Sequence, residues 1–107
     1  MTATNGTDTR PDLETMRAEL DGIDRQLLET LARRIECCVE IGEFKRVHHV
    51  RMMQPHRIDF VHRRAAAFAE ERGIDTTFIR SLYDLIIAET CRVEDLVIAG
   101  SEPEGDD

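Results

Sequence analysis

The sequence lacks the features that mark secreted and membrane-spanning proteins. Its three cysteines, two of them adjacent, do not make a disulfide framework. No signal peptide precedes Pro11, and no apolar run approaches the length of a membrane span. We therefore expect a cytoplasmic protein with reduced thiols and no membrane partner.

Recognisable metal, phosphate and nucleic-acid motifs are also missing. Adjacent cysteines such as Cys37 and Cys38 would point about 100° apart on a helix, and the four histidines lack a paired ligand spacing. There is no glycine-rich phosphate loop, Ser-His-Asp pattern or CxxC motif. The net charge of -8 leaves no basic footprint for nucleic acid. We expect no metal and no nucleic-acid partner.

What the sequence does contain is helical periodicity. From Leu13 to Ile41 apolar residues recur three and four positions apart, and no strong breaker follows until after Arg46. This pattern predicts a first helix over residues 12–47, about 50 Å long at 1.5 Å per residue. Gly42 lies inside it, and a glycine there indicates close packing.

Local signals delimit two further helices. Gln54 can cap and Pro55 can open the second helix, which Gly73 ends. Asp75 then caps a third. The buried side of the second helix is expected to carry Ile58, Val61, Ala65 and Phe68. No strand signal is present, so the fold class is all-α with three helices.

One small domain is expected over residues 12–99. Residues 1–11 and the acidic residues 100–107 are polar and read as disordered tails. The first helix is too long for a compact monomer of this size, so its apolar row must be covered by another element. A homodimer in which the long helices cover each other is the natural solution.

Charged residues in apolar rows are the candidates for function. Arg34 and Lys45, eleven positions apart, fall on one stripe of the first helix, and Glu94 projects from a mostly apolar strip of the third. An unpaired buried cation is costly, so these charges need a permanent partner or an anionic ligand. Snorkelling of the two cations, and an ion pair of Glu94 with an arginine such as Arg34, remain the alternatives.

Three stretches together carry a family resemblance. They are "MRAELDGIDRQLLETLARRIECCVEIGEFK", "QPHRI" and "IDTTFIRSLYDLIIAETCRVED". They resemble the all-helical chorismate mutase family, known as type II, over residues 13–98. The resemblance implies an intertwined homodimer of three-helix subunits with two shared active sites. It also implies a small dicarboxylate substrate and a [3,3] Claisen rearrangement that needs no cofactor.

The resemblance assigns the cationic residues to substrate carboxylates. Arg17 resembles the arginine that crosses to the neighbouring subunit's site, and Arg34 the one that binds a carboxylate in its own subunit. Lys45 resembles the lysine that contacts a carboxylate and the ether oxygen. Arg57 matches the arginine at the start of the second helix.

Two positions on the third helix complete the implied site. Thr90 falls where the family often has serine. Glu94 falls where members have glutamine or glutamate, on the other side of the ether oxygen. Because negative charge grows on that oxygen, we hypothesise that Glu94 is protonated and donates to it.

Two departures from the family pattern concern the substituent at C4. An aspartate and a glutamate usually surround the C4 hydroxyl, and here those positions hold Gln54 and Ile58. The segments "MMQPHRI" and "CRVEDLVI" are similar to the 4-amino-4-deoxychorismate mutases of antibiotic pathways. We therefore predict conversion of 4-amino-4-deoxychorismate to 4-amino-4-deoxyprephenate, towards antibiotics derived from 4-aminophenylalanine. Gln54 could accept a hydrogen bond from the amino group through its side-chain oxygen.

Three alternatives to this prediction stay open. Plain chorismate mutase activity and isochorismate-pyruvate lyase activity use the same fold. A catalytically silent helical dimer is the non-enzymatic alternative, and the intact set of four cationic residues argues against it.

Overall fold

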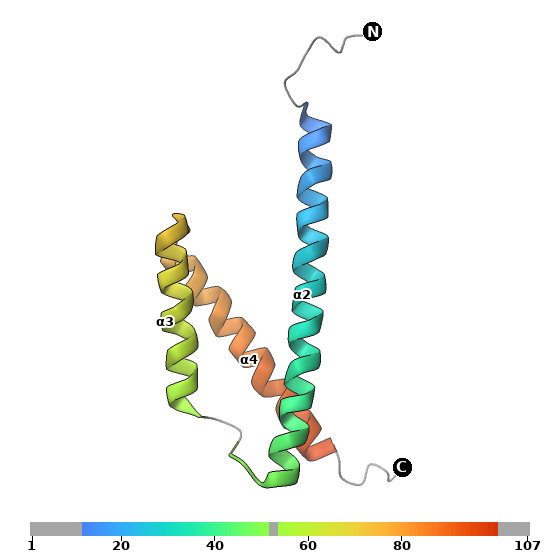
Figure 1. The fold of residues 1–107 in the computed structure, drawn as a ribbon, viewed down its shortest axis with the longest axis vertical. Helices are drawn as coiled ribbons and strands as arrows, with labels where there is room; N and C mark the ends of the chain where they lie inside the picture. Colours follow the sequence, from blue (N-terminus) through green and yellow to red (C-terminus); the bar gives the residue numbers. More distant parts are fainter. Residues whose placement is uncertain (1–11, 52–53, 101–107) are drawn as a thin grey trace. The chain divides into compact units, whose positions relative to one another are not determined.

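The computed structural model describes residues 12–51 and 54–100, and this part of the chain forms three α-helices (Figure 1). Helix α2 spans Leu13–His48, α3 spans Pro55–Arg72 and α4 spans Thr76–Gly100. The predicted all-α architecture and the long first helix are confirmed. Helix α4 continues through Gly100, so that residue is helical and not part of a tail. The rest of both predicted tails lies outside the described residues.

The starts of α2 and α4 carry aspartate caps. Asp12 Oδ1 accepts a hydrogen bond from the Thr15 backbone N–H at 2.8 Å, and hydrogen bonding with Thr15 lowers the pKa of Asp12 below its ordinary value. Asp75 Oδ2 accepts from the Phe78 N–H at 2.8 Å, as the sequence predicted for α4. These carboxylates satisfy N–H groups that the helices leave without an intrahelical partner.

The ends of α3 follow from proline and glycine. Pro55 occupies the first turn, where its missing N–H costs nothing. Gln54 holds the cap position with extended backbone, but its side chain makes no capping hydrogen bond, so that part of the prediction was wrong. Its amide instead donates to the Arg51 carbonyl at 3.3 Å. Gly73 ends α3 with a left-handed φ of 71°, which glycine adopts without a Cβ clash.

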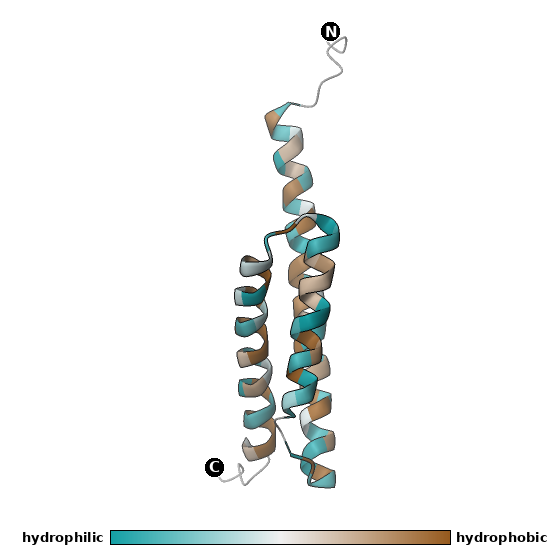
Figure 2. Cartoon of the chain, turned by 90° about the vertical axis from the view of Figure 1, so that its left-hand side faces the viewer, coloured by the Kyte–Doolittle hydropathy of each residue, from teal (hydrophilic) through white to brown (hydrophobic). Residues whose placement is uncertain are grey.

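The chain divides into two units at Arg34 and Ile35, inside α2. In the first unit, α2 presents an apolar row that a single chain leaves exposed, with exposed fractions between 38% and 64%. Its members are Leu13, Met16, Leu20, Ile23, Leu27, Leu28 and Leu31. Figure 2 shows apolar and polar positions alternating along this helix.

The second unit holds the rest of α2 together with α3 and α4. Helices α3 and α4 pack side by side, and Val61 and Ala69 are buried there (Figure 1). Phe68, predicted to be buried, is 48% exposed, while Ala69 is fully buried. The small Ala69 suits the face against α4, and the Phe68 ring lies 4.6 Å beneath the Arg72 guanidinium instead. Within the described part of the chain, no helix combines the length and the apolarity that a membrane span requires.

Candidate active site

The candidate site is built where the C-terminal part of α2 contacts α4. Gly42 is buried there, and a Cβ added to it would lie 3.3 Å from the Glu94 Cα and 3.2 Å from the Val97 Cβ. The absence of a side chain therefore lets the two helices approach closely, which confirms the packing predicted for this glycine. Lys45 follows three residues later, on the same side of α2.

Lys45 and Glu94 form an ion pair at this contact. Lys45 Nζ donates to Glu94 Oε1 at 2.8 Å, and the two side chains are only 14% and 5% exposed. The partner that the structure gives Glu94 is thus a lysine, where the sequence suggested an arginine such as Arg34. Both charges are partly removed from water, so each depends strongly on the other.

Thr90 lies one turn before Glu94 on α4. Its Oγ1 donates to the Ile86 carbonyl at 3.0 Å and accepts a hydrogen bond from the Cys38 thiol at 3.6 Å. Cys38 is 5% exposed, and the sequence analysis did not assign it a role at the site. Its place on the same helical stripe as Lys45 was the signal that could have found it. The two contacts hold the threonine hydroxyl in a defined orientation.

The start of α3 contributes the residues expected around the substrate's C4 substituent. Ile58 is half-buried, and Gln54 uses its amide nitrogen to bond the Arg51 carbonyl. The Arg57 guanidinium lies 5.2 Å from the centre of the Phe60 ring, and both residues are exposed. The arginine therefore has an aromatic support at the surface of α3.

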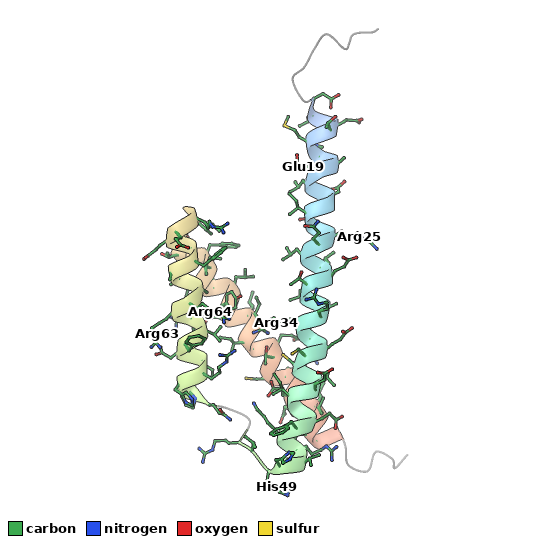
Figure 3. The ribbon with its side chains drawn as sticks, viewed as in Figure 1. Glu19, Arg25, Arg34, His49, Arg63 and Arg64 are labelled. Atoms are coloured by element: carbon green, nitrogen blue, oxygen red, sulfur yellow. The ribbon has the colours of Figure 1, made fainter. Side chains whose placement is uncertain are left out.

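The two remaining predicted residues belong to the first unit. Arg17 is exposed and Arg34 is half-buried, both on α2. Figure 3 labels Arg34 together with Glu19 and Arg25, which lie nearer the N-terminal end of this helix. Within the second unit, Lys45, Thr90 and Glu94 lie together. Arg17 and Arg34 belong to the first unit.

This arrangement can bind and polarise, and it suggests no covalent chemistry. It offers an ammonium group, a carboxyl group and a hydroxyl in a partly buried setting, where electrostatic interactions are stronger than in water. Among the described residues, no three His, Cys, Asp or Glu side chains are grouped in a way that could hold a metal ion. Of these three groups, the Lys45 ammonium is the one that can attract an anionic ligand.

Comparison with known proteins identifies the family. The model of the type II chorismate mutase family matches residues 16–95. The chain belongs to this family. Residues 16–95 include all eight predicted site residues, so the matched region contains the candidate site.

Curated relatives are similar along most of this chain. A 4-amino-4-deoxychorismate mutase of Streptomyces pristinaespiralis is 54% identical over 81% of this chain and 67% of its own length. A protein of the same name from Streptomyces venezuelae is 50% identical over 82% of this chain and 85% of its own length. The T-protein of Haemophilus influenzae is 27% identical over 73% of this chain but only 21% of its own length.

Proposed function

We propose that this protein is an isomerase that converts 4-amino-4-deoxychorismate to 4-amino-4-deoxyprephenate by a [3,3] Claisen rearrangement. The family model and two relatives of 50% and 54% identity that carry the name 4-amino-4-deoxychorismate mutase support this substrate. The reaction breaks one C–O bond and forms one C–C bond in a single step. It therefore calls for binding and charge stabilisation, and for no nucleophile or cofactor.

The ion pair of Lys45 and Glu94 is the observation that carries the proposal. During the rearrangement negative charge grows on the ether oxygen, and fixed donors aimed at that atom lower the barrier. Lys45 supplies a compact cation, and Glu94, when protonated, supplies a second donor. Their contact at 2.8 Å supports a role for both groups at the same ligand atom.

The arginines serve the two carboxylates of the substrate. Arg34 and Arg57 bind carboxylates within the subunit that holds Lys45, and Arg17 reaches the site of the neighbouring subunit. Forked hydrogen bonds from guanidinium groups hold the flexible enolpyruvyl arm over the ring. The arm is then already ordered when the substrate is bound, so less entropy is lost on reaching the transition state. Thr90 adds a hydroxyl whose orientation Cys38 and Ile86 support.

A homodimer is part of the same proposal. In a single chain the apolar row of the first unit is exposed, with Leu27 at 62% and Leu28 at 64%. Large apolar side chains at helical spacing favour burial against another helix, and a second copy of α2 offers the same row. Each active site then takes Arg17 from the partner and the remaining residues from one subunit. The cytoplasmic location expected from the sequence belongs to this proposal as well.

Residues 54 and 58 set the preference for the 4-amino substrate. Ile58 offers no hydrogen bond to a C4 hydroxyl, and the Gln54 amide oxygen is an acceptor for an amino group. Because Ile58 supplies no acceptor, a C4 hydroxyl has one hydrogen-bond partner fewer than an acidic residue at this position would give it, and the affinity for chorismate is lower.

The direct test is a substrate panel. Purified protein is incubated separately with 4-amino-4-deoxychorismate, chorismate and isochorismate, and each product is identified by mass spectrometry and NMR. We expect the highest kcat/KM for the 4-amino substrate, with the rearranged product as the one formed. A Lys45→Ala variant serves as the control for contaminating mutase. Three results would contradict the proposal. They are a higher kcat/KM for chorismate than for the 4-amino substrate, formation of salicylate and pyruvate from isochorismate, and no turnover of any substrate.

A further inference from the structure

The contact at Gly42 joins the backbone of one site-bearing helix to the backbone of the other. A Cβ at this position would meet the Val97 Cβ at 3.2 Å, and the Glu94 Cα and Val97 Cγ1 at 3.3 Å. These distances are shorter than ordinary van der Waals contacts, so a side chain would force a neighbour to move by a few tenths of an ångström. One of those neighbours is the main chain of Glu94 itself, which cannot swing aside as a flexible side chain can.

Gly42 also lies where the Lys45 side chain meets α4. Side chains on a helix lean towards its N-terminus, so a residue covers the turn that precedes its own Cα. Lys45, three residues after Gly42, is therefore placed to lean towards the turn that holds the glycine, and its Nζ bonds Glu94 Oε1 at 2.8 Å. The glycine thus touches the backbone of the residue whose side chain the lysine binds.

We propose that Gly42 is a positioning residue for the rearrangement: its missing side chain sets the distance between α2 and α4 and thereby the place of the Lys45 and Glu94 head groups. This inference rests on the proposed function for its catalytic consequence, but the geometric part stands on the helix contact alone. An alanine at residue 42 displaces α4 at Glu94 while leaving both head groups in the protein. Misplacement of donors costs rate because the barrier depends on their aim at the ether oxygen.

The chain offers two matched controls. Gly22 is also inside α2, about 140° around the helix from the apolar row, and a Cβ there would meet nothing within 4 Å. Gly22→Ala therefore repeats the change of residue type without the contact. Val97→Ala removes packing at the same contact without pushing the helices apart. Comparing the three variants separates the effect of displacing α4 from the effect of alanine's higher helix propensity and from the effect of packing lost at Val97.

The experiment measures kcat, KM and Tm for each variant with 4-amino-4-deoxychorismate. For Gly42→Ala we expect kcat to fall about tenfold with KM within about twofold of wild type, the signature of a contact that matters in the transition state. A glycine that serves only helix packing would give a different result, because the crowded Cβ would lower Tm while the folded enzyme kept its kcat. Gly22→Ala and Val97→Ala should keep kcat within about threefold, since neither displaces the head groups.

A crystal structure of Gly42→Ala provides the second readout. We expect the Lys45 Nζ to Glu94 Oε1 distance to lengthen or the pair to take a new arrangement. If Gly42→Ala does not fold, the double variant Gly42→Ala/Val97→Ala removes the Val97 Cγ1 atom while keeping the contact with the Glu94 backbone. The same fall in kcat and the same change in the Lys45–Glu94 pair are expected. Wild-type kcat together with an unchanged pair distance would overturn the inference. A wild-type protein without mutase activity would contradict the proposed function instead. The Lys45 Nζ to Glu94 Oε1 distance in the Gly42→Ala crystal structure would still decide whether Gly42 determines the geometry of this pair.

Discussion

Lys45 Nζ and Glu94 Oε1 lie 2.8 Å apart, although 49 positions of sequence separate the two residues. The pair joins α2 to α4 and is mostly shielded from water, with side chains 14% and 5% exposed. In the absence of substrate each group therefore satisfies the other. On the proposed function, an anionic substrate would give the ammonium group a second negative neighbour.

The first prediction concerns Glu94 and pH. An ionised carboxylate facing the ether oxygen would repel the charge that grows there, so a protonated carboxyl is the better donor. We expect the wild-type kcat to increase as the pH falls. Glu94→Gln supplies a donor at every pH, so its kcat profile should be flat and within about tenfold of the low-pH wild-type rate, or about 1.4 kcal/mol. Parallel profiles, or a variant that is dead at all pH values, would show that Glu94 acts as an ionised partner that positions Lys45.

The second prediction concerns the stability of the ion pair. Lys45→Met leaves the Glu94 carboxylate buried without its cation and should cost about 3 kcal/mol in the free energy of unfolding. The double variant Lys45→Met/Glu94→Leu removes both charges and should cost clearly less. The measurement is urea unfolding at one fixed protein concentration, because a dimer's stability depends on concentration.

An exposed pair on the same helix provides the control for that experiment. Arg25 and Glu29 are 3.3 Å apart with side chains 80% and 65% exposed, and Figure 3 shows Arg25 projecting from α2. Arg25→Ala should change the free energy of unfolding by less than about 0.5 kcal/mol, as solvent screens such pairs. Equal losses in Lys45→Met and in the double variant would mean that the burial of Glu94 is not what makes Lys45 important.

The third prediction tests the shared active site. Arg17→Ala and Lys45→Ala should each be nearly inactive as homodimers. After subunit exchange, half of the dimers are mixed, and one site of each mixed dimer has both residues intact, so about a quarter of wild-type activity should return. Native mass spectrometry of differently tagged subunits verifies the mixed dimer. No recovery in confirmed mixed dimers would place Arg17 and Lys45 in the site of one subunit.

The fourth prediction addresses substrate choice at C4. Ile58→Glu restores an acceptor for a hydroxyl, and a charged hydrogen bond of this kind contributes about 1.5–3 kcal/mol. The ratio of kcat/KM for chorismate to that for 4-amino-4-deoxychorismate should therefore increase by about tenfold or more. Ile58→Leu is the matched control, since it keeps the apolar surface and should leave the ratio nearly unchanged. An equal ratio of the two kcat/KM values in Ile58→Glu and wild type would show that Ile58 does not determine the preference for the C4 substituent.

Helix boundaries and the unusual residues could be predicted from the sequence because their causes are local. Pro55, Gly73 and Asp75 act through φ angles and capping bonds that involve only a few neighbouring residues, and the structure places the helix ends there. Lys45 and Glu94 were conspicuous because charge in an apolar row is costly wherever the row is buried. The chemical class of the substrate came from the resemblance and not from these local signals.

Only the tertiary structure decided which residues meet. The sequence suggested an arginine such as Arg34 as the ion-pair partner of Glu94, whereas the structure pairs Glu94 with Lys45. Helical periodicity gives a residue's angle on its own helix and says nothing of the neighbour it faces. The contact at Gly42 brings α4 close enough to α2 for Lys45 to reach Glu94, and packing against α4 buries Ala69 in place of Phe68. Such choices depend on how two helices cross and on the volumes at the crossing, which are properties of the packed pair and not of either segment.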